Sequence, residues 1–248
     1  LLFTHFTNSA ENYIYPFSKK ENEKDYKTIF ERMPGTDDEK LANIKLAIVF
    51  KHLMKGSQLS NIDVDSVSDS VNTKDFNKFL EEFRSIYTKY KDCIKSNENE
   101  PFKYKCVENQ VVTREYFDGK SNIIVVFNFS NESFDEYRIN VSKEGVYQEV
   151  FNTDDKKYGG KGIVNKKPVN TEDVVEDSSI SLTVKVPALS VVAYSYREFT
   201  AEELEEMYQK NKKKAYDYVA KETDKINKKL EEDIANLKKE ADIKLKEL

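Results

Sequence analysis

Residues 102–197 alternate apolar and polar side chains along short runs, and this pattern limits the fold more than any other in the chain. The runs are rich in Val, Ile, Tyr and Phe, and turn-forming pairs such as Asp118-Gly119 and Gly159-Gly160 separate them. The expected strands are 103–108, 110–117, 122–129, 136–141, 146–151, 180–185 and 190–196. Several short strands with regular turns predict an antiparallel β-sandwich. The run IIVVFNF is apolar almost throughout, which is typical of a central strand covered on both faces.

Two segments before this block carry helical spacing. In residues 36–55 the apolar side chains follow one helix face, and Thr36 with Glu39 forms a capping box at the start. Residues 74–95 place aromatic and aliphatic side chains at i, i+3, i+4 and i+7, which indicates a helix face packed into a core. The polar residues 57–73 between the two helices predict a loop.

The end of the chain, residues 200–248, contains neither Gly nor Pro and begins with a second capping box, Thr200 and Glu203. The last part fits about three heptads. The heptad sites are Leu230 and Leu237 at d and Ile234, Ala241 and Leu248 at a, with Lys244 at a further d site. A straight helix of this length spans about 70 Å. We therefore expect its distal half to project, and either to fray or to bind a second copy or another protein.

Composition and charge exclude several classes of function. The net charge of −5 and the pI near 5.4 argue against a nucleic-acid binder, whose binding domain is basic. No apolar run reaches the roughly 18 residues of a membrane span. Cys93 and Cys106 lack metal-ligand spacing and are expected to be reduced thiols, with a disulfide as the alternative. His5 and His52 have no partner pattern. We therefore predict no metal, no cofactor and a cytoplasmic location.

An ordered set of short motifs runs through the strand block. The motifs are Asn128-Phe129-Ser130, Tyr137-Arg138-Ile139, Gly145 through Asp154, Tyr158-Gly159-Gly160, Gly162, Asn165 and Pro187-Ala188-Leu189-Ser190. In this order they resemble the carboxy-terminal β-sandwich of bacterial glycogen branching enzymes, which belong to the α-amylase superfamily. The resemblance implies the α-amylase type of C-terminal sandwich. It also implies a link to glycogen biosynthesis, in which the family transfers a 1,4-α-glucan segment to a 6-hydroxyl.

Upstream motifs resemble the same family. They are Pro16-Phe17-Ser18, Arg32-Met33-Pro34-Gly35 and Lys40 through Leu46. In the family a His-Asp pair follows the first motif; the His binds the sugar and the Asp stabilises the oxocarbenium-like transition state. This chain carries Lys19 and Lys20 there and retains Glu21. An ammonium cannot replace a carboxylate that meets developing positive charge, because the field changes sign.

Two further departures from the family concern its barrel. The nucleophilic Asp and the acid Glu of the family have no counterpart in this chain, and the apolar eighth strand is missing after Gly56. A barrel cannot close without it. We therefore predict an α+β chain with a helical remnant of a (β/α)8 barrel at 1–100, an all-β sandwich at 101–198 and a long amphipathic, coiled-coil-like helix at 199–248.

These departures predict a chain without catalytic residues that is inactive alone and has a glucan-binding or structural role. The alternative is an interaction protein that oligomerises through the 200–248 helix. A third hypothesis, the end of an active branching enzyme completed by another chain, is disfavoured by the two lysines. Aromatic side chains stack on sugar rings, so the candidate α-glucan contacts are Tyr137, Tyr147 and above all Tyr158 in its Gly-rich loop. For each of these rings, core or cross-strand packing is the favoured interpretation. Weaker candidates are Tyr116, Phe117 and Phe134.

Overall fold

A computed structural model describes most of the chain. The described residues are 30, 33–53, 72–96, 104–106, 108–119, 121–174 and 179–246. Lys19, Lys20, Glu21 and His5 lie outside them, as does nearly all of the predicted loop 57–73. The chain divides into two compact units, Leu1–Glu198 and Phe199–Leu248.

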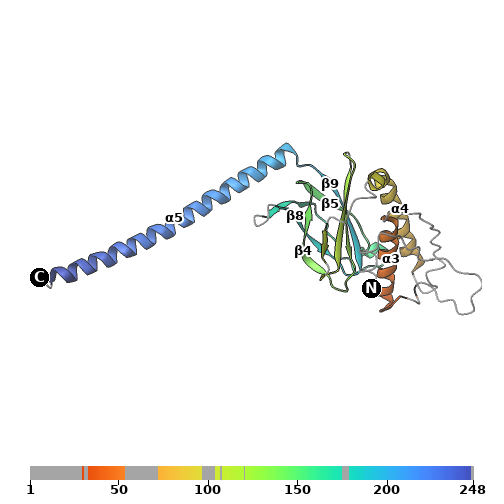
Figure 1. Ribbon diagram of the computed structural model, residues 1–248, viewed down its shortest axis with the longest axis horizontal. Coiled ribbons are helices and arrows are strands. Elements are labelled where there is room, and N and C mark those ends of the chain that lie inside the picture. The colour runs from red at the N-terminus through yellow and green to blue at the C-terminus, as the bar shows by residue number, and fades with distance from the viewer. Residues whose placement is uncertain are drawn as a thin grey trace, which may run out of the picture. The chain divides into compact units, whose positions relative to one another are not determined.

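The first unit contains two helices followed by an antiparallel β structure (Figure 1). The helices are α3 (Asp37–Leu53) and α4 (Thr73–Ser96). The strands are β1 (Tyr104–Cys106), β2 (Val111–Phe117), β3 (Asn122–Asn128), β4 (Phe134–Val141), β5 (Val146–Asn152), β6 (Val169–Asn170), β7 (Glu172–Val174), β8 (Ser179–Val186) and β9 (Ser190–Arg197). All the strands expected from the sequence are present, and the short β6 and β7 were not predicted. The α+β class and the antiparallel sandwich are confirmed.

The strands form two sheets, and the helices cover one of them. The larger sheet has the order β1-β2-β3-β9-β5-β6 and the smaller one β4-β8-β7. In β3, Ile123, Val125 and Phe127 join the core under α3 and α4, whereas Ile124 and Val126 join the core between the sheets. Every residue of β3 is buried. This confirms the prediction of a central strand covered on both faces.

The capping boxes predicted at the starts of α3 and the C-terminal helix are both present. Glu39 Oε2 accepts the backbone N–H of Thr36 at 2.7 Å, and Thr36 Oγ1 accepts that of Glu39 at 3.4 Å. Thr200 and Glu203 repeat this arrangement at 2.9 and 3.2 Å. Both predicted capping boxes are therefore formed, and each satisfies N–H groups that a helix start otherwise leaves unpaired.

The aromatic face of α4 packs into the core, as its spacing predicts. Phe76, Phe79 and Phe83 are buried, with Phe79 fully so. The ring of Phe79 lies 6.0 Å from that of Phe151 on β5, and the ring of Phe83 lies 5.8 Å from it. Ring pairs at these separations add to the burial of apolar surface. They fix α4 against the larger sheet.

The second unit is the single helix α5 (Ala201–Lys246), 46 residues long. This confirms the long helix expected from Thr200 onwards. Its large apolar side chains are exposed, from Leu204 and Tyr208 near its start to Leu237 and Ile243 near its end. Among the described residues, no helix combines the length and the apolar character that crossing a membrane requires.

Candidate functional site: a polar cavity beneath helix α3

Lys45 is a buried cation in the middle of the apolar face of α3. It is 2% exposed, and its Nζ donates to the carbonyl oxygens of Thr153 at 2.7 Å and Tyr158 at 3.2 Å. Burial lowers the pKa of Lys45 to about 8, and the nearby carboxylate of Asp154 partly opposes that shift. Lys45 therefore fastens α3 to the loop that follows β5. The sequence reasoning missed it, although a lone charge between Ile44 and Leu46 was the available signal.

The loop after β5 is folded around the carboxylate of Asp154. Its Oδ1 accepts the backbone N–H of Lys161 at 3.0 Å and its Oδ2 accepts that of Ile163 at 2.9 Å. A Cβ added at Gly160 would lie 2.1 Å from the carbonyl oxygen of Asp154, so a residue without a side chain is needed there. Asp155 caps the short 3-10 helix Lys156–Tyr158. The motif that resembles branching enzymes is therefore a loop scaffold here.

Glu82 of α4 makes a second connection to this loop. Its Oε2 accepts hydrogen bonds from Tyr158 Oη and Lys157 Nζ, both at 2.6 Å. Burial alone would raise the pKa of Glu82, but these two hydrogen bonds outweigh it and lower the pKa. Glu82 is therefore an ionised anchor, which only the three-dimensional structure reveals.

The structure puts the three principal glucan-contact candidates in the core. Tyr137, Tyr147 and Tyr158 are at most 7% exposed. Tyr147 Oη donates to the carbonyl of Lys143 at 2.9 Å, and Tyr137 Oη accepts from Asn109 Nδ2 at 3.3 Å. These positions agree with the packing alternative. Glucan contact by the three rings stays an untested prediction.

The weaker aromatic candidates are also engaged with protein groups. Tyr116 is buried and donates to the carbonyl of Leu53 at 3.0 Å. The ring of Phe134 packs on another sandwich ring at a centroid separation of 4.9 Å. Phe117 is 39% exposed, but the Nζ of Lys143 lies 3.3 Å from its ring centroid. Each of the three therefore already has a protein partner.

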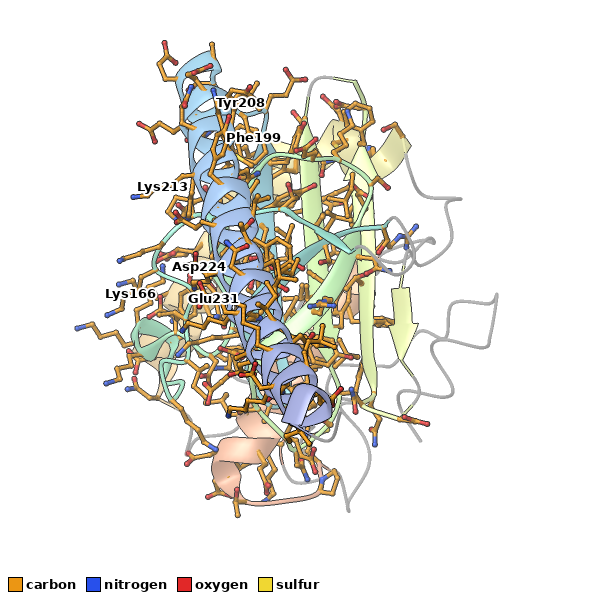
Figure 2. All side chains as sticks on the ribbon, turned by 90° about the vertical axis from the view of Figure 1, so that its left-hand side faces the viewer. Lys166, Phe199, Tyr208, Lys213, Asp224 and Glu231 are labelled. Atoms are coloured by element: carbon orange, nitrogen blue, oxygen red, sulfur yellow. The ribbon has the colours of Figure 1, made fainter. Side chains whose placement is uncertain are left out.

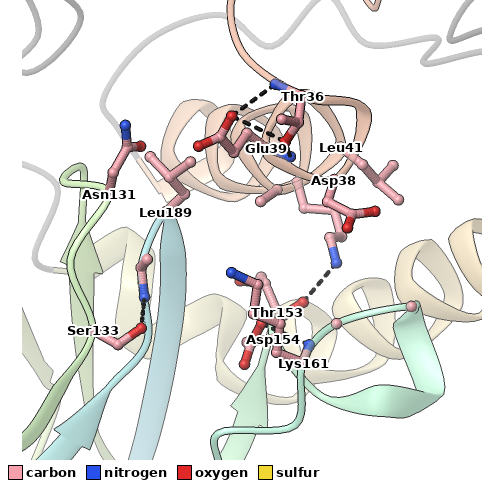
Figure 3. Close-up of a pocket in the computed structure, with 15 residues that line it drawn as sticks. Thr36, Asp38, Glu39, Leu41, Asn131, Ser133, Thr153, Asp154, Lys161 and Leu189 are labelled. Carbon is pink, nitrogen blue, oxygen red and sulfur yellow. Dashed lines mark hydrogen bonds between the residues drawn. The ribbon is translucent and has the colours of Figure 1, made fainter.

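A cavity of about 250 Å³ lies between the first turns of α3 and three sandwich loops (Figure 3). It is lined by Thr36, Asp38, Glu39, Leu41, Ala42, Lys45, Asn131, Ser133, Thr153, Asp154, Gly159, Gly160, Lys161, Ala188 and Leu189. Its walls thus mix carboxylates, ammonium groups, an amide, hydroxyls and a few apolar side chains. No sequence pattern pointed to it, because its lining comes from four separate stretches of the chain.

The carboxylates of this cavity are poorly suited to acid–base catalysis. Hydrogen bonds from the backbone N–H and hydroxyl of Thr36 lower the pKa of Glu39, whereas a general acid needs a raised one. Both oxygens of Asp154 already accept backbone N–H groups. Asp38 is exposed to solvent. The cavity can therefore offer hydrogen bonds and charge, but its described carboxylates do not form a proton donor and nucleophile pair.

Other reactive side chains have structural partners. In the part of the chain that the structure covers, no group of three or more His, Cys, Asp or Glu side chains could hold a metal. His52 Nδ1 lies 2.7 Å from the carbonyl of Ile48, and burial lowers its pKa. Cys93 is a buried reduced thiol whose Sγ donates to the carbonyl of Ser121 at 3.4 Å, and burial raises its pKa to about 11, which leaves little nucleophilic thiolate. The side chain of Cys106 lies outside the described residues.

The fold and its loop motif define the class of this protein. Residues 108–197 match the family model of the alpha amylase, C-terminal all-beta domain. Over most of its length the chain is distantly homologous to 1,4-alpha-glucan branching enzymes. It is 25% identical to that of Bacillus caldolyticus over 180 residues, which cover 64% of this chain and 27% of the relative. It is 26% identical to that of Paramagnetospirillum magneticum over 218 residues, which cover 78% and 29%.

The chain therefore spans less than a third of these curated relatives. Among solved structures, the alpha-amylase from H. orenii is similar, with 11% identity and a TM-score of 0.31, over 64% of this chain and 36% of that one.

Proposed function

We propose that this chain is a non-catalytic relative of the C-terminal region of glycogen branching enzymes. In this proposal α3, α4 and the sandwich form one structural module. The observation that carries it is the use of the family-like loop: Lys45 and Glu82 bind it from two helices, and Asp154 holds it together. Residues in these roles build an interface and are not available for bond cleavage.

We infer that α3 and α4 derive from the last helices of an α-amylase barrel. The run Lys40 through Leu46, which resembles a family motif, lies in α3, and both helices pack on the larger sheet. The predicted domain boundaries near 100 and 198 belong to this proposal. A remnant of this kind explains why helices that resemble barrel helices pack on the sandwich.

The decisive test is chain transfer on amylose by the purified full chain. The reaction is followed by the iodine colour and by counting new 1,6 linkages after debranching. A functional branching enzyme is the positive control. We expect no transfer, because Lys19 and Lys20 occupy the positions of the family's His and Asp. New 1,6 linkages made by this chain alone would overturn the proposal.

A second candidate role is glucan contact at the cavity beneath α3. The mixed polar lining with Leu189 suits a neutral ring that carries many hydroxyls. Its volume of about 250 Å³ is just below the ~300–1,000 Å³ of typical ligand sites, so it fits about one sugar ring. The side chains of Asp38 and Lys161 are both exposed at the rim, so they can change without loss of core packing.

Affinity electrophoresis in gels that contain glycogen tests this role, with maltoheptaose as competitor. We expect D38A and K161A to lose most of the retardation of the wild-type chain. K166A, an exposed lysine outside the cavity, is the matched control and keeps it. If the wild-type chain is not retarded, the glucan-binding role is abandoned and the structural role stands alone.

The remaining proposal concerns α5, whose exposed apolar side chains favour the interaction-protein alternative. Such surface on a lone helix is typical of an association site. In this role the module displays α5 to a partner. A cytoplasmic location is part of the same proposal.

A further inference from the structure

Mostly apolar side chains of α5 recur with a period of 11 residues, and Lys212 and Thr223 are the polar exceptions. Successive members of the repeat are separated by four, three and four positions. They are Tyr208, Lys212, Ala215, Val219, Thr223, Ile226, Leu230, Ile234, Leu237 and Ala241, and the sequence continues the spacing at Leu245 and Leu248. We call the ten members from Tyr208 to Ala241 the α5 stripe. Heptad spacing places Lys244 at a d position of the apolar face, whereas the 11-residue spacing places Leu245 there.

The period of 11 keeps the stripe on one side of the helix. Three turns per 11 residues is about 3.67 residues per turn, close to the 3.6 of a straight α-helix. The stripe drifts by only about 20° per repeat, and in the sense of a slight right-handed supercoil. Its large apolar members are between 43% (Ile234) and 65% (Ile226) exposed. A largely apolar face, interrupted at Lys212 and Thr223, therefore runs along most of α5.

We propose that α5 pairs antiparallel with α5 of a second copy of this chain, about a two-fold axis between Glu222 and Thr223. This inference deepens the association role proposed above by naming the partner. Positions equally far from the axis then face each other. Tyr208 faces the partner's Leu237, Ala215 faces the partner's Leu230, and Val219 faces the partner's Ile226. A large side chain thus meets a smaller one at several levels, which is how helix interfaces fill space.

The same register matches the charges beside the stripe. The lysine block Lys212–Lys214 lies opposite the partner's Glu231, Glu232 and Asp233, and the axis repeats this match on the other side. Figure 2 labels four of the residues that lie at successive heights along α5, namely Tyr208, Lys213, Asp224 and Glu231. Lys212, a polar member of the stripe, faces the partner's Asp233, and a polar stripe position fixes register.

Nearer the axis, Asp217 faces the partner's Lys228 and Lys221 faces the partner's Asp224. Like charges meet only towards the ends, where Glu205 faces the partner's Glu240. A parallel pair would instead set each lysine block beside the same block of the partner, which is destabilising. Charge therefore selects both the antiparallel direction and the register.

A membrane surface fits the stripe less well than a second copy of the chain does. Helices that lie on anionic membranes carry an excess of Lys and Arg on their polar face. Ala201–Lys246 contains twelve acidic and twelve basic residues, with both signs interspersed. Such a balance gives no attraction to an anionic surface and suits a partner with the same mixed pattern.

The first test is sedimentation equilibrium of the full chain. We expect a dimer, and we expect L230K to raise its dissociation constant by at least about tenfold, because the symmetry removes two contacts. The matched control is I243K: Ile243 is 58% exposed but points away from the stripe, so this variant changes dimerisation by less than about threefold. A wild-type chain that stays monomeric at about 100 μM, a concentration at which even weak dimers form, sinks the proposal.

Disulfide trapping tests the direction. T223C is expected to cross-link with itself, because it lies beside the axis. L237C alone gives no more cross-linking than the wild-type chain with its native cysteines, but a mixture of L237C with a size-tagged Y208C gives the mixed dimer. A parallel pair predicts the reverse: L237C cross-links with itself and the mixture adds nothing.

Charge exchange tests the register. The triple variants K212E/K213E/K214E and E231K/E232K/D233K should each dimerise weakly, and mixing them should restore dimers. Failure of the mixture to dimerise contradicts this register. If the chain is monomeric and binds phosphatidylserine vesicles through the stripe, the partner of the stripe is a membrane surface and the dimer proposal is wrong. Amylose transfer by a chain that still dimerises overturns only the non-catalytic role.

Discussion

Helices α3 and α5 differ in how their apolar side chains are covered, and therefore in how each helix is stabilised. Of the 17 residues of α3, seven are buried against the sandwich, including Lys45. Along the 46 residues of α5, most of the large apolar side chains that the structure describes are exposed, from Leu204 to Ile243. Both begin with the same Thr/Glu capping box, so the difference lies in what their apolar faces meet.

The comparison shows where each helix draws its free energy of folding. α3 is held by tertiary burial, which is large enough to accommodate the desolvated ammonium of Lys45, whose Nζ donates to two carbonyl oxygens. α5 has only its cap, its helix-forming composition and pairs such as Lys225–Glu222 at 2.6 Å, each of which contributes a few tenths of a kcal/mol. Changes in the helix–sandwich interface should therefore cost much more than equal changes in α5.

The largest expected effect is that of F79A. Phe79 is fully buried among rings of α4, β5 and the 3-10 helix, so its loss should lower the free energy of unfolding by about 3–5 kcal/mol. Urea unfolding followed by near-ultraviolet circular dichroism, which reports on packed aromatic side chains, measures this change. The matched variant I243A in α5 should change it by less than about 0.5 kcal/mol. Equal losses in the two variants would contradict the comparison.

Periodicity and turn chemistry were enough to predict the elements of both regions. The alternation around β3, the aromatic spacing of α4 and the Gly-free run of α5 each reflect a local rule that tertiary contacts did not override. The roles of Lys45 and Glu82 could not be predicted in this way, because their partners Thr153 and Tyr158 lie more than 70 positions away in the sequence. Likewise the cavity exists only where four distant stretches meet.

The candidate sugar contact at Tyr158 illustrates the same limit. Tyr158 stands in a Gly-rich loop, which in sequence indicates an exposed position. In the fold that loop is turned towards α4, because Asp154 binds its backbone and Glu82 accepts the Tyr158 hydroxyl. The burial of the Tyr158 ring therefore depends on contacts with distant residues, which no local sequence pattern predicts.

The next largest effect is a pH dependence due to Lys45. Burial lowers its pKa from 10.5 to about 8, so between these values the unfolded chain binds more protons than the folded one. Stability linked to this group is therefore lowest below pH 8 and rises with pH; the gain between pH 8 and 10 should be about 2 kcal/mol. K45M should lack this rise, whereas K40M, on the same helix, should keep it. Urea unfolding at pH 7, 8, 9 and 10 separates the two. A wild-type chain whose stability is flat over this range, as in K45M, would show that the ammonium of Lys45 is not desolvated.

The smallest effect concerns the hydrogen bond between Tyr158 and Glu82. Y158F keeps the buried ring and removes only the hydroxyl that donates to Glu82 at 2.6 Å, so we expect a loss of about 0.5–1.5 kcal/mol. Y196F is the matched control, because the Tyr196 hydroxyl donates to the carbonyl of Glu144 at 3.2 Å in an exposed setting and should contribute less. A double-mutant cycle of Y158F with E82Q isolates the pair. If the losses of free energy in Y158F and E82Q are strictly additive, the two side chains do not interact. Lys157 would then be the only anchor of Glu82 in this loop, through a partly exposed ion pair like those along α5.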